Sequence, residues 1–176
     1  MKKMIALLCA ALLLAVSCAL ADGNTVVEFR DALRLNGSLP DGYSYTLINS
    51  DDSSLLGQIA SADPDAPVLA VSVAFNDNDS YIRAESLKDL SEEELGLIRD
   101  SFGDSNVTFD TLTTASGDVL MVVRENGAQF LDFYAVCRGY EIDLTLFPAG
   151  GTVLTEEQIG KCLEFIKTLD IVPGHE

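Results

Sequence analysis

The sequence contains no tryptophan and a single histidine, His175, which is its next-to-last residue. Serine and cysteine hydrolases of the usual kinds need a positioned imidazole base, and many zinc sites need an imidazole ligand. The phosphate-binding patterns G-x-G-x-x-G and G-x-x-x-x-G-K-[ST] and the zinc pattern H-E-x-x-H are also absent from the sequence. We therefore expect no catalytic residue of these classes, no bound metal and no cofactor.

Positive charge is scarce as well. The chain has 11 lysines and arginines against 28 aspartates and glutamates, which gives a formal net charge of −17. A molecule this acidic repels phosphate backbones, so nucleic acid is excluded as a partner. Attraction of a cation or a basic partner remains compatible with the charge.

The first 21 residues have the form of a signal peptide. Lys2 and Lys3 precede an apolar run from Ile5 to Val16, and Ala19-Leu20-Ala21 has the small-x-small pattern of a cleavage site. The apolar run is shorter than the roughly 20 residues that a membrane-spanning helix needs, and no second such run follows. We expect residues 22–176 to be a secreted or periplasmic, extracytoplasmic protein without a membrane span.

Cys18 leaves a second interpretation of this segment open. Ala15-Val16-Ser17-Cys18 approximates a lipobox, in which the cysteine is lipidated and becomes the first residue of a membrane-anchored lipoprotein. In either case two of the basic residues leave with the signal. The mature chain cleaved before Asp22 carries 9 basic and 28 acidic side chains, a formal net charge of −19.

Two helices have clear start signals. Ser91 with Glu94, and Thr155 with Gln158, have the spacing of capping boxes, each followed by apolar residues at helical intervals. The first helix is expected to end at Gly103, and the second before Pro173.

Strand patterns fill the intervals around these helices. Alternating or β-branched runs cover 43–48, 55–60, 67–75, 107–113, 118–124, 129–137 and 140–147. The apolar positions change from odd to even at Arg138-Gly139, which predicts a turn or bulge there. We predict one α+β domain over residues 22–176, an antiparallel β-sheet of about six to seven strands covered by two main helices. Residues 22–38 are expected to be a loosely packed N-terminal segment, and 24–37 could form either a short helix or an edge strand.

Two cysteines remain after removal of the signal. Cys137 lies on the apolar face of a predicted strand and Cys162 on the apolar stripe of the second helix. Exported proteins favour disulfides, and this pair would close a loop worth about 3 kcal/mol. We predict a Cys137–Cys162 disulfide, with two buried free thiols as the alternative.

The element order resembles the PsbP-like and DcrB-like folds of exported proteins and lipoproteins. The resemblance covers about residues 38–172 and rests on the SLPDGYSYTL opening, the GYEIDLTL strand and the LTEEQI helix. It implies an antiparallel sheet flanked by helices and a role in binding and assembly. No functional residue is carried over from it.

One polar loop has the oxygen-rich composition of a cation site. Asn76-Asp77-Asn78-Asp79-Ser80 alternates acid and amide side chains, the ligands that Ca²⁺ prefers, but it lacks the glycine and glutamate of an EF-hand. Asp77 and Asp79 are the candidate ligands, and a solvated loop is the alternative.

Two functional hypotheses follow. The first is an acidic, non-catalytic binding or assembly domain for an unknown protein or small-molecule partner. The second is a hydrolase that works through carboxylates alone, since 28 acidic residues could supply such a pair. The sequence singles out no pair of carboxylates for this chemistry.

Overall fold

The computed structural model describes residues 25–103, 106–125, 127–149, 151 and 153–174. The predicted signal peptide with Cys18, and His175 near the other end, lie outside the described residues. No helix within the described ranges is long and apolar enough to cross a membrane.

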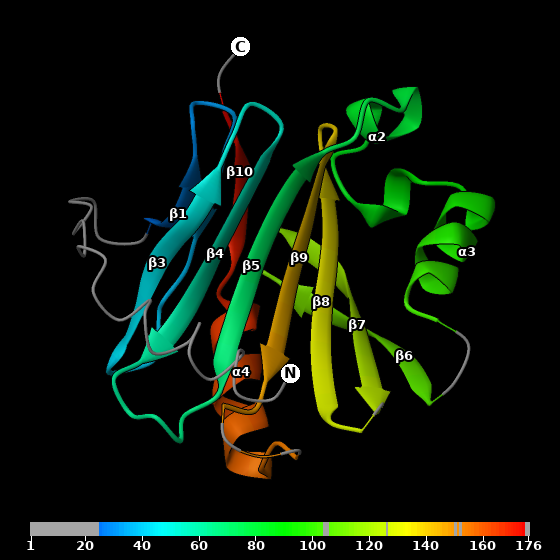
Figure 1. Cartoon of the computed structure of the whole chain (residues 1–176). Helices are drawn as coiled ribbons and strands as arrows, with labels where there is room; N and C mark the ends of the chain where they lie inside the picture. The colour runs from blue at the N-terminus through cyan, green and yellow to red at the C-terminus, as the bar shows by residue number, and fades with distance from the viewer. Residues whose placement is uncertain (1–24, 104–105, 126, 150, 152, 175–176) are drawn as a thin grey trace.

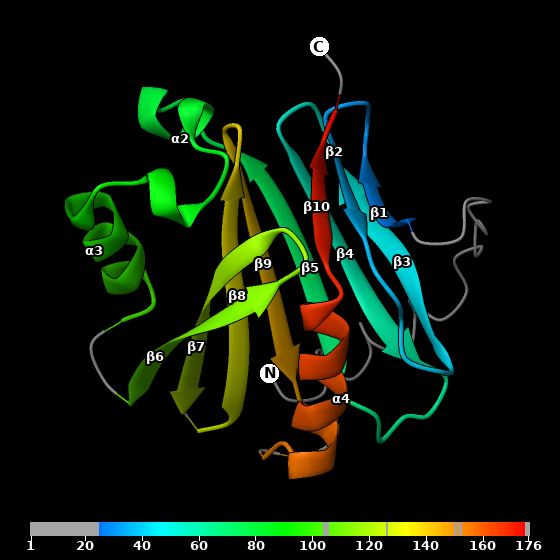
Figure 2. The ribbon, with the colours of Figure 1, turned by 180° about the vertical axis from the view of Figure 1, so that it is seen from behind.

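Strands dominate the described residues and form two antiparallel sheets (Figures 1 and 2). The small sheet has the order β1-β2-β10, and the large sheet has the order β3-β4-β5-β9-β8-β7-β6. The strands of the small sheet are β1 (Thr25–Phe29), β2 (Leu33–Asn36) and β10 (Asp170–Pro173). Those of the large sheet are β3 (Tyr43–Ser50), β4 (Ser54–Ser61), β5 (Val68–Phe75), β6 (Val107–Thr114), β7 (Gly117–Glu125), β8 (Gln129–Cys137) and β9 (Tyr140–Phe147).

The helices are α2 (Asp79–Arg83), α3 (Glu92–Ser101) and α4 (Glu156–Lys167), with a 3₁₀ turn at Leu87–Asp89. Both predicted capping boxes are confirmed. The side chains of Ser91 and Thr155 accept hydrogen bonds from the backbone N–H groups of Glu94 and Gln158. In return, the side chains of Glu94 and Gln158 accept from the backbone N–H groups of Ser91 and Thr155. These contacts satisfy N–H groups that an α-helix leaves unpaired at its start.

The predicted fold class, an α+β domain whose sheet is covered by two main helices, is wrong. The described residues are 49% strand and 21% helix, with ten strands and three α-helices. The reason is that a second sheet, not a helix, covers much of the apolar face of the large sheet. Figure 2 shows β1, β2 and β10 lying across that face, with α4 below them.

The N-terminal hairpin of β1 and β2 is part of the core, so these described residues of the expected 22–38 segment are not loosely packed. The inward side chains of its strands are Val27, Phe29, Leu33 and Leu35, and each is at most 2% exposed. They pack with Cys162, Phe165 and Ile166 of α4 and with the inner face of the large sheet in one apolar cluster. Burial on this scale stabilises the fold by about 2 kcal/mol for each large apolar side chain.

The other face of the large sheet, the outer face, is seen in Figure 1. A second apolar cluster lies there, where α2, the 3₁₀ turn and α3 pack on β7 and β8 through Tyr81, Leu90, Ile98, Val122 and Val136. On this face the helices cover the part of the sheet around β7 and β8, and no helix lies over β3, β4 and β5 in Figure 1. The outer face therefore has a boundary, in the middle of the sheet, between strands covered by helices and strands without helical cover.

Candidate functional site

Polar and charged side chains gather on the outer face at the edge of its helical cover. We call this group the outer-face cluster; it consists of Arg124 on β7, Asp132 and Tyr134 on β8, and Glu141, Asp143 and Thr145 on β9. Residues two apart on a strand share a face. The β8–β9 register then sets Asp132 opposite Thr145, and Tyr134 opposite Asp143.

Asp132 is the most buried member of the cluster, with 0% of its surface exposed. Arg124 donates to it from Nε and from Nη2, both at 2.6 Å, and the Thr145 hydroxyl donates to its Oδ1 at 2.8 Å. A carboxylate taken out of water needs such partners, because an unpaired buried charge is strongly destabilising. The Asp132 carboxylate therefore neutralises most of the positive charge of Arg124.

Aromatic rings hold the Arg124 guanidinium in place. Its central carbon lies 5.2 Å from the Phe130 ring centroid and 5.9 Å from that of Phe102. Phe102, which caps the end of α3, also meets Tyr134 edge to face at 6.2 Å. Cation–π and edge contacts of this kind favour a fixed geometry.

Glu141 is held by two donors. The Tyr134 hydroxyl donates to its Oε2 at 2.7 Å, and Asn76 donates to its Oε1 at 2.5 Å. Burial and the neighbouring Glu141 carboxylate raise the pKa of Tyr134 well above its ordinary value. Tyr134 therefore acts as a hydrogen-bond donor at any physiological pH.

Asp143 differs from the other carboxylates of the cluster in having a buried oxygen without a hydrogen-bond donor. Its Oδ1 is buried and accepts no hydrogen bond from any described residue. Burial and the nearby charge of Asp132 raise the pKa of Asp143 from 3.8 to about 6, against the opposing effect of Arg124. A shift of this kind is typical of carboxyl groups at functional sites.

A groove of about 370 Å³ opens beside these groups. Ser101 and Phe102 at the end of α3 form one wall, and Tyr134, Glu141 and Asp143 contribute the polar lining. On the neighbouring strand β5, Ser72 lies directly opposite Asp143, and Ala74 opposite Glu141. Small side chains at these two positions leave room beside the carboxylates on that side, while Asp143 Oδ1 itself is buried.

The groove is suited to a ligand that brings a hydrogen-bond donor and positive charge. Arg124 and Asp132 neutralise each other, so Glu141 and Asp143 set the sign of the remaining charge. The rings of Phe102 and Tyr134 can meet the apolar part of a ligand or its cation. Its volume falls within the range of small-molecule sites.

A larger cleft of about 740 Å³ lies at the other side of the molecule, between α4 and the ends of β3, β4 and β5. Its floor belongs to the apolar core, and its rim carries acidic side chains, including Asp63, Asp65 and Glu164. Lys161 on this rim is paired with Glu157 at 2.7 Å. The rim charges are exposed, and the cleft has no buried ionic group comparable to Asp132, so we place the site at the outer-face cluster.

The predicted cation ligands Asp77 and Asp79 lie at the start of α2. Asn78 caps this helix by accepting from the Ser80 N–H, and Asp79 pairs with Arg83 one turn later. No group of three or more His, Cys, Asp or Glu side chains in the described ranges could hold a metal ion. Cation binding by Asp77 and Asp79 stays a prediction.

The predicted Cys137–Cys162 disulfide is not formed, and both residues are buried free thiols. Cys137 pairs with Tyr140 at one end of β9, whereas Cys162 lines the same cleft as Leu146 near the other end. Six residues of strand span about 20 Å, and a disulfide needs Cα atoms within about 7 Å. Both cysteines face the same core, but at opposite ends of it.

No family model and no curated protein matches this sequence. The resemblance to PsbP-like and DcrB-like domains therefore rests on the sequence pattern alone.

Sequence reasoning singled out none of the charged residues of the outer-face cluster. A signal was present: Asp132 lies between Leu131 and Phe133, and Asp143 between Ile142 and Leu144. An acidic residue in the middle of a strongly apolar strand is unusual unless it is paired or functional. Neither strand by itself could show that the two acids lie on the same face next to Arg124.

Proposed function

We propose that this chain is an exported, non-catalytic binding domain whose outer-face groove takes an organic cation. The ligand class is a primary ammonium group on an apolar stem. The ammonium would donate to Asp143, and the stem would lie along Phe102 and Tyr134. The binding role that the family resemblance implies is compatible with this proposal.

The observation that carries the proposal is the unpartnered Oδ1 of Asp143. A buried acceptor without a donor costs about 1–3 kcal/mol, and a charged one costs more. A cationic ligand would remove this cost on binding, because it supplies both the donor and the opposite charge. The net charge of −17 would add long-range attraction for cations.

Calorimetric titration of residues 22–176 with phenethylammonium at low salt tests the proposal. The matched probes are 2-phenylethanol, which has the same stem without charge, and 3-phenylpropionate, which has the opposite charge. We expect the ammonium to bind best, with higher affinity at pH 8 than at pH 5, because Asp143 with a pKa of about 6 is ionised only at the higher pH.

Asp143→Asn is expected to abolish the preference for the charged probe. Asp110→Asn is the matched control, since Asp110 is an exposed strand residue on β6. Equal binding of the three probes by the native chain, or an Asp143→Asn variant that binds as well as the control, would reject the groove as a cation site.

Hydrolysis through carboxylates is the second candidate, and Asp143 is the observation that favours it. A carboxyl group with a pKa of about 6 is suited to general acid catalysis. The neighbouring Glu141, however, already accepts from Tyr134 and Asn76, which leaves it poorly placed to act as the second carboxylate. Turnover of 4-nitrophenyl glycosides near pH 5.5 that disappears in Asp143→Asn would favour hydrolysis over simple binding.

The location of the mature protein is part of the proposal. Export with cleavage before Asp22 and anchoring through lipidated Cys18 predict different masses. Intact mass spectrometry of the protein recovered from its native host separates the two.

A further inference from the structure

A second cleft, of about 550 Å³, lies where the β1–β2, β3–β4 and β8–β9 turns meet α2, at the upper end of the molecule in Figure 1. We call it the aromatic cleft; the residues that matter to it are Phe29, Arg30, Phe75, Ile82, Arg138 and Tyr140. It shares no lining residue with the outer-face groove.

Three aromatic rings form a continuous wall in this cleft. Tyr140 meets Phe29 edge to face at 5.8 Å and Phe75 at 5.3 Å. Phe29 is buried in the core, but Phe75 is 44% exposed and the neighbouring Ile82 is 43% exposed, so the outer part of this wall is open to solvent. Exposed apolar side chains beside an aromatic cleft offer contact area to the apolar part of a ligand.

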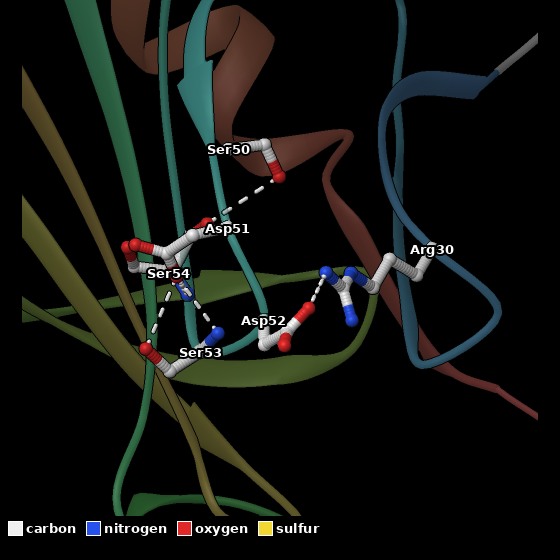
Figure 3. Close-up of polar contacts among 6 residues, drawn as sticks. All are labelled: Arg30, Ser50, Asp51, Asp52, Ser53 and Ser54. Carbon is white, nitrogen blue, oxygen red and sulfur yellow. Dashed lines mark hydrogen bonds and ion pairs between the residues drawn. The ribbon is translucent and has the colours of Figure 1, made fainter.

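Two arginines flank the aromatic wall, in a chain with only 11 basic residues. Arg30 in the β1–β2 turn pairs with Asp52 in the β3–β4 turn, as Figure 3 shows, and Arg138 pairs with Glu85 through Nε. Both arginine side chains are about half exposed. Exposed ion pairs contribute little to stability, and the guanidinium groups keep further N–H donors for a ligand.

Both arginines also adopt a backbone conformation that arginine disfavours. Arg30 has a φ of 54° and Arg138 a φ of 47°, and Asn106 is the one other non-glycine residue with positive φ in the described chain. Arg138 and Gly139 form a two-residue hairpin turn with positive φ at both positions, where asparagine or glycine would fit without strain. Strain of this kind persists where a side chain is needed for function.

The turn itself does not need the Arg138 side chain. Its backbone is held by hydrogen bonds from Arg138 N to Ala84 O and from Gly139 N to Tyr81 O, both at 2.7 Å. Any residue except proline could make the first of these bonds from position 138. The arginine therefore contributes a guanidinium at the cleft and not the shape of the turn.

We propose that the aromatic cleft binds a flat aromatic carboxylate. The ring of the ligand stacks on Phe75 and Tyr140, and its carboxylate meets the free donors of Arg138, with Arg30 on the other side of the cleft. Arginine is the side chain best suited to this contact, because its planar donors match a carboxylate in pairs. Asp31 and Asp52 line the same cleft, so the paired donors of the arginines, and not a net positive charge, favour the carboxylate.

Calorimetric titration of residues 22–176 with 2-naphthoate tests this inference, with 2-naphthalenemethanol as the uncharged match. Naphthoate is expected to bind and the alcohol to bind at least tenfold more weakly, the loss expected for one paired ionic contact. Arg138→Asn keeps the turn and is expected to raise the Kd for naphthoate by about tenfold or more, with an unchanged or higher melting temperature.

Arg83→Gln is the control, because Arg83 is a highly exposed arginine on the adjacent helix α2. It is expected to leave the Kd unchanged. Arg30→Asn gives a second variant that is independent of the β8–β9 turn. Failure of the native chain to bind naphthoate, equal binding of the alcohol, or unchanged affinity in both arginine variants would overturn the inference. A large loss of melting temperature in Arg138→Asn would also overturn it, since the arginine would then serve the fold.

Discussion

Arg124 and Asp132 form a two-pronged ion pair on a sheet face, with both N–O distances at 2.6 Å and the carboxylate fully buried. A fold rarely gains stability from such a pair relative to apolar side chains of similar size, but losing one partner is costly. The pair is therefore the fixed part of the outer-face cluster, and its two charges act on the pKa of the neighbouring Asp143 in opposite directions.

Removal of Arg124 is expected to be severely destabilising. Arg124→Met leaves the Asp132 charge buried with only Thr145 as a donor, so we expect a loss of about 3 kcal/mol in the free energy of unfolding. Adding Asp132→Leu to this variant is expected to restore most of the loss. Urea denaturation of both variants measures this coupling, and a single-variant loss below about 1 kcal/mol would mean that the pair is not isolated from water.

Asp143→Asn is expected to stabilise the chain at neutral pH. The pKa of Asp143 is about 6 in the folded state against an ordinary 3.8, so the folded state keeps its proton at pH values where the unfolded state has lost it. Stability then falls as the pH rises from about 4 to about 6, and the full cost, about 3 kcal/mol, is present above pH 6.

Urea denaturation at pH 4 and pH 8 checks this prediction. The Asp143→Asn variant is expected to match the native chain at pH 4 and to exceed it at pH 8. A variant that is less stable at pH 8 would show that the ionised carboxylate is paired in the fold.

The two cysteines are expected to be free in the native protein. Burial raises the pKa of Cys162 to about 12 and also raises that of Cys137, so both thiols should react slowly with a thiol reagent until denaturant is added. Reduction should leave the mass of residues 22–176 unchanged. A gain of two hydrogens on reduction would reinstate the Cys137–Cys162 bond.

Gly57 is expected to be required for packing between β3 and β4. A Cβ at this position would overlap the ring and hydroxyl of Tyr45. Gly57→Ala should therefore cost about 2 kcal/mol in thermal or urea denaturation.

Gly96 in α3 provides the matched control, because nothing lies within 4 Å of a Cβ built there. Gly96→Ala is expected to stabilise by about 0.5–1 kcal/mol through helix propensity. Similar effects of the two substitutions would mean that Tyr45 can move aside at no cost.

Local signals in the sequence predicted local structure well. The caps at Ser91 and Thr155 and the turn at Arg138-Gly139 depend on a few neighbouring residues, and all three are confirmed. The small sheet could not be predicted in this way. Its middle strand β2 pairs with β1 and with β10, and β10 lies more than 130 residues further along the chain.

The candidate site could not be predicted from the sequence for a related reason. Strand alternation tells which side chains share a face, but only the register between strands brings Asp132 opposite Thr145, diagonal to Asp143. The disulfide prediction was wrong for the same reason, because the sequence pattern does not show how distant elements are aligned. Cys137 and Cys162 face the same core, but the distance between them depends on where α4 packs along the sheet.

The central claim is that Asp143, whose buried Oδ1 has no hydrogen-bond donor among the described residues, binds a cation. NMR titration of its side-chain carboxyl carbon, with and without saturating phenethylammonium, tests this claim most directly. We predict a pKa near 6 in the free protein that falls toward the ordinary range when the cation is bound, because the bound charge favours the ionised form. A pKa that starts near 4, or that stays near 6 in the presence of the cation, would contradict the account.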